Sequence, residues 1–122
     1  MFKKIYKSFY FAGSGLIYAL KSQRNMKIHL TIFLLVLLIC RWLKISYVEW
    51  AIIIFAAGLV FITELLNTAL ETTVDLEIQE YNKQAEIAKD LAASAVLVAS
   101  VVSVIIGIII LGPKIFFKVY GP

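Results

Sequence analysis

The segment TELLNTALETTVD, Thr63–Asp75, places four polar side chains where a long apolar run ends. On a helix, which advances 100° per residue, Glu64, Asn67, Glu71 and Asp75 fall within about 80° of one another. An ionised carboxylate at membrane depth costs several kcal/mol, and such groups normally face a bundle interior or a wet cavity. We therefore expect one polar stripe that faces the inside of the protein.

These residue types suit the transfer of a phosphoryl group, which depends on positioning and charge neutralisation. Glu64 lies deepest in the apolar run and is a candidate general base for a hydroxyl proton. Glu71 lies about 10 Å further along the helix, and nucleotide-bound Mg²⁺ takes one or two such carboxylates. Lys89, followed by Asp90, begins the next apolar run and offers a point charge to phosphates. The sequence contains neither a Walker loop nor a kinase glycine loop.

The elements that hold these residues are membrane helices. Of the 122 residues, 61% are hydrophobic and 16% are charged, and the apolar residues come in blocks. This composition is typical of a single small domain built from a few membrane-spanning helices. The one cysteine, Cys40, lies inside an apolar run and is interpreted as a core residue.

The hydrophobic pattern predicts an all-α protein with one surface helix and three spans. Residues 2–22 have helical periodicity and basic side chains, as in an amphipathic helix that lies in the membrane interface. The predicted spans cover residues 28–47, 50–70 and 91–112.

The connections between these spans can also be predicted. The polar segment 71–90 lacks Pro and Gly, so we expect the second helix to continue into it and the chain to turn near Asn82. The third span is rich in Ala, Ser and Gly, which allow close helix packing. We expect Gly112-Pro113 to end that span.

Basic residues indicate the orientation in the membrane. Eight lie on the side of the N-terminus and four on the other side, which places the N-terminus and the 71–90 segment in the cytoplasm. Six of the eight precede the first span: Lys3, Lys4, Lys7, Lys21, Arg24 and Lys27. We interpret this cluster as a contact with anionic lipid headgroups and not with nucleic acid.

The motif ELLNTALETTVD, followed by AKDLAASAVL, resembles the signature of the prokaryotic diacylglycerol kinase family. These are small integral-membrane lipid kinases and include the undecaprenol kinases of Gram-positive bacteria. RNMKIH, Arg24–His29, is similar to the segment before the first span in the Gram-positive branch. The resemblance covers nearly the whole chain.

The resemblance implies an activity, a cofactor and an assembly. It implies ATP- and Mg²⁺-dependent phosphorylation of a membrane lipid alcohol, undecaprenol first and diacylglycerol second, at the cytoplasmic interface. It further implies a homotrimer in the bacterial plasma membrane, with active sites composed from neighbouring subunits. The sequence does not separate the two lipids, because both present a primary hydroxyl at the same depth.

The resemblance also assigns roles to individual residues. By position, Glu64 matches the general base, which also meets the lipid substrate, and Asn67 matches a polar partner at the nucleotide. Glu71 matches a metal-binding carboxylate that also meets the nucleotide. Lys89 and Asp90 match the pair that binds the nucleotide phosphates.

Other positions are expected at the edges of this site. They are Phe11 on the surface helix near the nucleotide, Glu80 and Asn82 in the loop that lines the nucleotide, and Ala93 and Ser94 near the lipid headgroup. One position departs from the family, which commonly has a second metal-binding glutamate where this chain has Gln23. An amide oxygen can still bind Mg²⁺ and meet the nucleotide, but it does so without the charge.

Three other interpretations stay open at this point. A small proton-coupled transporter would also use a lone membrane glutamate, but it has little need for Asn67, Glu71 and Lys89 at one boundary. A non-enzymatic membrane subunit could retain the fold, and Gln23 could mark a catalytically impaired paralogue. His29, the single histidine, is interpreted as an interfacial residue and not as a ligand.

Overall fold

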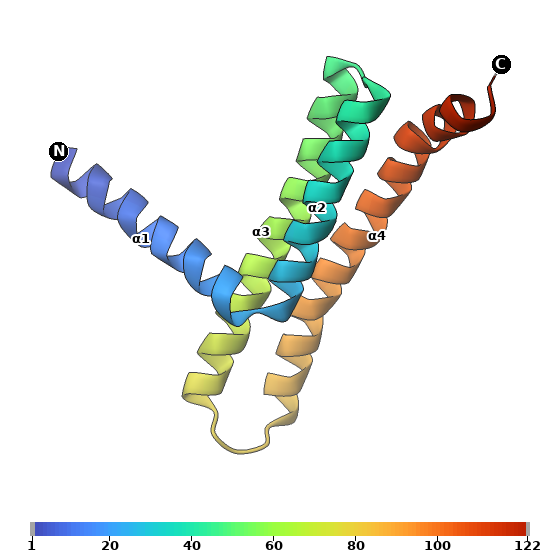
Figure 1. Cartoon of the computed structure of the whole chain (residues 1–122). Coiled ribbons are helices and arrows are strands. Elements are labelled where there is room, and N and C mark those ends of the chain that lie inside the picture. The colour runs from blue at the N-terminus through green and yellow to red at the C-terminus, as the bar shows by residue number, and fades with distance from the viewer. Residues whose placement is uncertain (1, 122) are drawn as a thin grey trace.

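The computed structural model describes residues 2–121, which form four α-helices and no strand (Figure 1). The helices are α1 (Phe2–Ser22), α2 (Arg24–Leu43), α3 (Tyr47–Glu77) and α4 (Lys83–Tyr120). Helices α2, α3 and α4 run side by side, and α1 projects away from the end of this bundle where α2 begins (Figure 1). All three bundle helices are long and apolar enough to cross a membrane. The predicted all-α membrane fold is confirmed.

Helix α2 begins and ends earlier than predicted. Its 20 residues extend about 30 Å, the thickness of a bilayer core. Lys44 adopts a left-handed conformation, with φ 52°, and closes the helix. The prediction that the first span reaches Tyr47 is wrong, because Ser46 starts α3: Ser46 Oγ accepts from the Glu49 N–H at 3.3 Å, and Glu49 Oε2 accepts from the Ser46 N–H at 2.7 Å.

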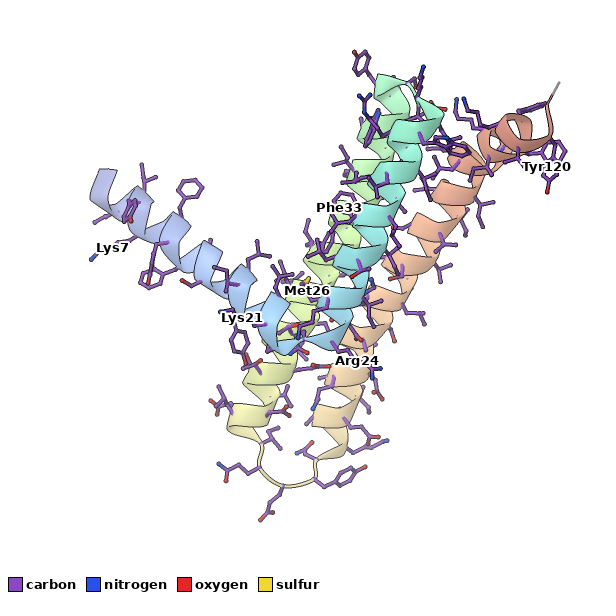
Figure 2. The ribbon with its side chains drawn as sticks, in the orientation of Figure 1. Lys7, Lys21, Arg24, Met26, Phe33 and Tyr120 are labelled. Atoms are coloured by element: carbon purple, nitrogen blue, oxygen red, sulfur yellow. The ribbon has the colours of Figure 1, made fainter. Side chains whose placement is uncertain are left out.

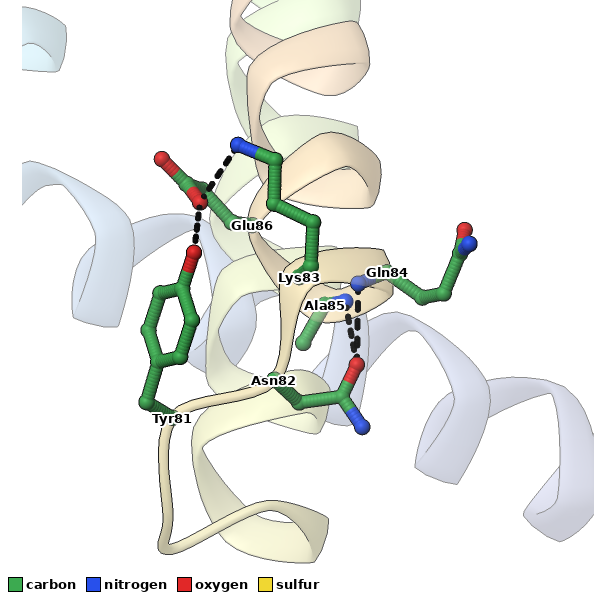
Figure 3. A network of polar contacts seen from close by, with 6 residues as sticks. All are labelled: Tyr81, Asn82, Lys83, Gln84, Ala85 and Glu86. Atoms are coloured by element: carbon green, nitrogen blue, oxygen red, sulfur yellow. Dashed lines mark hydrogen bonds and ion pairs between the residues drawn. The ribbon is translucent and has the colours of Figure 1, made fainter.

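Helix α3 continues beyond its apolar part to Glu77, as predicted for the polar segment. A short loop, residues 78–82, then leads into α4. Asn82 caps α4, since its Oδ1 accepts from the N–H groups of Gln84 at 2.9 Å and Ala85 at 3.2 Å (Figure 3). The predicted turn near Asn82 is confirmed.

The prediction that Gly112-Pro113 ends the third span is wrong, because α4 continues through Pro113 to Tyr120. A proline removes one helical hydrogen bond, but membrane helices accommodate this loss where neighbouring groups compensate. One residue further on, Lys114 Nζ forms an ion pair with Glu49 Oε1 at 3.2 Å and ties the end of α4 to the start of α3. The last turns of α4 bend away from the axis of the preceding turns (Figure 1), as is typical of proline.

Packing is closest between α3 and α4, which run antiparallel (Figure 1). Ser103 Oγ of α4 donates to the carbonyl oxygen of Ala56 of α3 at 3.0 Å, the kind of bond that small residues permit. Towards the end of α2, Cys40 packs with Ile53 and Leu111 and is completely buried, which confirms its interpretation as a core residue.

Among the side chains that the structure describes, those of helix α1 that are buried against the bundle lie near its C-terminal end. Ala19 and Met26 are buried at this junction, which Figure 2 marks at Met26. Further towards the N-terminus, the side chains of α1 around Lys7 stand clear of the other helices (Figure 2). Its exposed aromatic residues include Tyr6, Phe9, Tyr10, Phe11 and Tyr18.

Candidate active site

A polar pocket of about 310 Å³ lies between the start of α2 and the parts of α3 and α4 that pass next to it. Its lining residues are Asn25, Ile28 and His29 of α2, Glu64, Asn67 and Glu71 of α3, and Ala93, Val96, Leu97 and Ser100 of α4. The three helices thus bring polar residues from distant parts of the sequence to one place. The pocket lies at the boundary between the apolar part of α3 and its polar extension.

Three of the four residues of the polar stripe of α3, Glu64, Asn67 and Glu71, line this pocket. The Glu64 side chain is 1% exposed and that of Asn67 is 6% exposed. Glu64 Oε2 and Asn67 Oδ1 have no hydrogen-bond partner among the described residues. Leaving a buried polar atom unpaired costs roughly 1–3 kcal/mol, and such atoms in a native fold call for a functional explanation.

Glu71 lies two helical turns from Glu64 and is only half-buried. Asn67 Nδ2 donates to Glu71 Oε1 at 3.2 Å, so the amide orients this carboxylate. Glu71 also lines the pocket. One helix face therefore offers a buried carboxylate and a water-accessible one.

Beyond the pocket, an ion pair joins the two long helices. Lys89 Nζ of α4 donates to Asp75 Oδ1 of α3 at 2.9 Å. Asp75, the last member of the stripe, therefore contacts Lys89 and does not line the pocket. The pair holds Lys89 close to the polar end of α3.

The loop before α4 has its own polar network, drawn in Figure 3. Tyr81 Oη donates to Glu86 Oε2 at 2.9 Å, and Lys83 Nζ donates to the same oxygen at 3.0 Å. The hydrogen bond to Glu86 raises the pKa of Tyr81, because it stabilises the protonated phenol. These contacts fix the loop that contains Glu80 against the first turn of α4.

Four predicted site residues line the pocket of this single chain, namely Glu64, Asn67, Glu71 and Ala93. The others lie outside it: Phe11, Gln23, Glu80, Asn82, Lys89, Asp90 and Ser94. Phe11 is 66% exposed on α1. Gln23 precedes α2, where its side chain makes no capping hydrogen bond. Ser94 Oγ donates to the carbonyl oxygen of Asp90 at 2.7 Å.

The sequence pattern assigned no site role to several polar residues that lie near the site, and His29 was interpreted as an interfacial residue. Asn25 and His29 both line the pocket, and their spacing of four residues puts them on one helix face. Thr68 is buried, and its Oγ1 has no hydrogen-bond partner in the described part of the chain. Ser100 was interpreted as a packing residue of the third span, although it also reaches the pocket.

Comparison with known proteins identifies the family. Residues 10–111 match the family described as Prokaryotic diacylglycerol kinase. The chain is 41% identical over 112 residues to an undecaprenol kinase of Bacillus subtilis, which covers 92% of this chain and 91% of that protein. It is 42% identical over 109 residues to a diacylglycerol kinase of Synechocystis, with 88% and 62% covered. It is 33% identical over 110 residues to the diacylglycerol kinase of Escherichia coli K12, with 90% of each covered. The chain therefore belongs to the prokaryotic diacylglycerol kinase family, a family of lipid kinases.

Proposed function

We propose that this lipid kinase transfers the γ-phosphoryl group of ATP to the hydroxyl group of undecaprenol, with Mg²⁺, at the cytoplasmic membrane interface. The observation that carries the proposal is the buried Glu64, which lines a polar pocket at the end of an apolar helix segment and whose Oε2 has no hydrogen-bond partner among residues 2–121. The Bacillus subtilis relative supports undecaprenol. Diacylglycerol is the second candidate, supported by the Synechocystis and Escherichia coli relatives.

Glu64 acts as the general base in this proposal. As the lipid oxygen forms its bond to the γ-phosphorus, Glu64 accepts the hydroxyl proton. The bond between the γ-phosphorus and the oxygen that bridges to the β-phosphate breaks, ADP leaves, and Glu64 later releases the proton to water. A positioned base typically contributes about 10²- to 10⁴-fold to the rate.

Glu71 is suited to hold Mg²⁺. No cluster of three or more His, Cys, Asp or Glu side chains that could hold a metal occurs among residues 2–121. The protein would then supply one or two oxygen ligands, as is usual for Mg²⁺ that is bound together with phosphates and water. Glu71 Oε2 fits this role, and the Gln23 amide oxygen would add a neutral ligand. The ion, when bound, neutralises charge on the phosphates.

The remaining predicted residues would complete the nucleotide site. Lys89 and Asp90 would face the phosphates, and Glu80, Asn82 and Phe11 would surround the nucleoside. Phe11 is 66% exposed on α1, and α1 projects away from the end of the bundle where α2 begins (Figure 1). An oligomer in which a neighbouring subunit contributes α1 would bring this helix to a pocket. The proposal therefore includes a homotrimer, as the family resemblance implies, with a cytoplasmic N-terminus on the same side as the ATP.

A phosphorylation assay tests the proposal. Purified protein in lipid nanodiscs would receive γ-labelled ATP and Mg²⁺ with either undecaprenol or diacylglycerol. We expect label in the lipid fraction, dependence on Mg²⁺, and a higher kcat/KM for undecaprenol. Transfer of label to neither lipid would contradict the proposal and would favour a non-enzymatic subunit or a transporter.

A further inference from the structure

Helix α4 continues past the part of the chain that matches the family. The family match ends at residue 111, whereas α4 reaches Tyr120. Residues 91–111 of this helix already extend about 30 Å, which is enough to cross the bilayer core. The final turns therefore lie at the membrane surface, at the end of the bundle opposite to the start of α2, and they bend away from the axis of α4 (Figure 1). The proposed phosphoryl transfer gives them no role.

These final turns, residues 113–120, form the C-terminal segment and are amphipathic. The exposed aromatic residues of the segment are Phe116, Phe117 and Tyr120. The rings of Phe116 and Tyr120 contact each other, with centroids 5.4 Å apart, and Tyr120 stands clear of the other helices (Figure 2). On a helix, Lys114 and Lys118 fall 40° apart. The segment therefore has one narrow basic side, and aromatic rings occupy much of the rest.

The end of the bundle that holds the C-terminal segment is basic. Helix α2 ends there with Arg41 and Lys44, which are both exposed, and the segment adds Lys114 and Lys118. Among the described residues at this end, the acidic one is Glu49, and it is already paired with Lys114 at 3.2 Å. Basic side chains thus outnumber acidic ones four to one. The phosphate groups of anionic lipids would balance this excess.

We propose that the C-terminal segment lies in the membrane interface and, together with Arg41 and Lys44, binds the phosphate headgroups of anionic phospholipids in the leaflet opposite to the polar pocket. Aromatic rings are favoured at the depth where acyl chains meet headgroups, and lysine side chains extend from that depth towards water. The inference does not depend on the proposed phosphoryl transfer. It adds a lipid-binding surface on the other side of the membrane.

The rings and the charges favour this partner over the alternatives. A segment that projected into water would leave three aromatic rings in solvent, although burial of apolar surface is favourable. A second copy of the chain would bring equal basic groups together, and like charges repel. An anionic lipid surface suits both features, because acyl chains meet the rings while phosphates meet the basic side chains.

The first experiment uses the two tryptophans of the protein, which both lie at this end. They are Trp42 near the end of α2 and Trp50 near the start of α3. The protein would be placed in phosphatidylcholine vesicles that contain equal fractions of either brominated phosphatidylglycerol or brominated phosphatidylcholine. The difference in fluorescence quenching gives the preference of this end for the anionic lipid. We expect a preference of roughly fivefold or more at low salt, the factor typical of one basic residue at an anionic surface, and a smaller one at high salt.

Matched variants test which side chains create the preference. Lys118→Gln and Arg41→Gln should each lower it by about two- to fivefold. Lys21→Gln is the control, because Lys21 is an exposed lysine of α1 at the other end of the bundle (Figure 2). The control should keep the preference of the wild type.

The second experiment tests where the C-terminal segment lies. Phe117→Trp would be introduced together with Trp42→Phe and Trp50→Phe, so that position 117 holds the single tryptophan. Brominated phosphatidylglycerol should quench it strongly, and acrylamide, which quenches from water, should quench it weakly. Tyr81→Trp in the same background is the control, because Tyr81 is 81% exposed in the loop before α4, and it should show the reverse.

Four results would each overturn the inference. Equal quenching of the wild type by the two brominated lipids would show that this end does not prefer anionic lipid. An unchanged preference in both Lys118→Gln and Arg41→Gln would show that other groups create it. Acrylamide quenching at position 117 as strong as at position 81 would place the segment in water. Protection of position 117 from both quenchers would show that the segment packs against a second copy.

Discussion

Glu64 and Glu71 lie two turns apart on one face of α3, but their surroundings differ. Glu64 is 1% exposed, and its Oε2 has no hydrogen-bond partner in the described part of the chain. Glu71 is half-buried and accepts a hydrogen bond from Asn67 at 3.2 Å. Burial disfavours metal access and favours proton transfer at Glu64, whereas access to water and phosphate favours metal binding at Glu71. Two glutamates thus have different proposed roles because they lie at different positions along one helix.

Gln23 provides a test of the metal site at the scale of one residue. Gln23→Glu should lower the Mg²⁺ concentration that gives half-maximal rate by an amount on the order of tenfold, since an added unit charge near an ion contributes about 1 kcal/mol or more. Mg²⁺ titrations of the kinase rate would measure the change. Gln84→Glu, which adds the same charge at an exposed position of α4, is the control. Superimposable titration curves for Gln23→Glu and wild type would show that Gln23 lies outside the metal site.

The sequence predicted the residues of this site unevenly. Glu64, Asn67 and Glu71 could be found because they repeat along one helix, and the helical period alone puts them on one face. His29, Ser100 and the rest of the pocket wall depend on how α2 and α4 approach α3, and no short-range pattern encodes that approach. The structure was needed to show that His29 lines the pocket that contains Glu64.

At the scale of the helices, the hydrophobic pattern predicted which helices form better than it predicted where they start and end. The predicted second span began at residue 50, whereas α3 begins at Tyr47. The pair Ser46 and Glu49 has the spacing of a capping box, and it starts α3. Pro113 is a strong local stop signal, yet α4 passes it and places Lys114 against Glu49. That ion pair joins two helices, so the propensity of the local sequence could not reveal it.

Asn82 caps α4 and is also a predicted nucleotide-binding residue, and its role as a cap can be tested separately. Asn82→Ala should lower the free energy of unfolding by about 1 kcal/mol, because two N–H groups lose their acceptor. Asn82→Asp keeps an acceptor oxygen and should keep the stability. Thermal unfolding in detergent would measure both variants. If Asn82→Asp unfolded as readily as Asn82→Ala, capping would not be the reason for the loss.

At the scale of the whole molecule, three crossing helices put the two ends of the chain on opposite sides of a membrane. The pocket is lined by residues from the start of α2, where α1 joins the bundle, while α4 ends at the opposite end of the bundle (Figure 1). ATP is cytoplasmic, so the proposed activity requires the N-terminal side to be cytoplasmic. The distribution of basic residues favours the same orientation.

Cysteine labelling tests this orientation. Lys4→Cys and Tyr120→Cys introduce thiols at exposed positions near the two ends, and the native Cys40 is buried. In intact cells a membrane-impermeant maleimide should label position 120, and it should label position 4 only after lysis. Labelling of position 4 in intact cells would place the pocket outside the cytoplasm and would contradict the proposed reaction.

The most direct test of the proposed mechanism is the turnover number of Glu64→Gln with saturating ATP, Mg²⁺ and undecaprenol. This variant keeps the size of the side chain and removes the base, so kcat should fall about 10²- to 10⁴-fold, which equals roughly 3–5 kcal/mol of barrier. The KM for ATP and the oligomeric size should stay close to wild type, because the base acts mainly in the transition state. Glu71→Gln, in contrast, should raise the KM for ATP–Mg²⁺ as well as lower kcat. If Glu64→Gln kept more than about a tenth of the wild-type kcat, Glu64 would be a structural residue and the mechanism would be wrong.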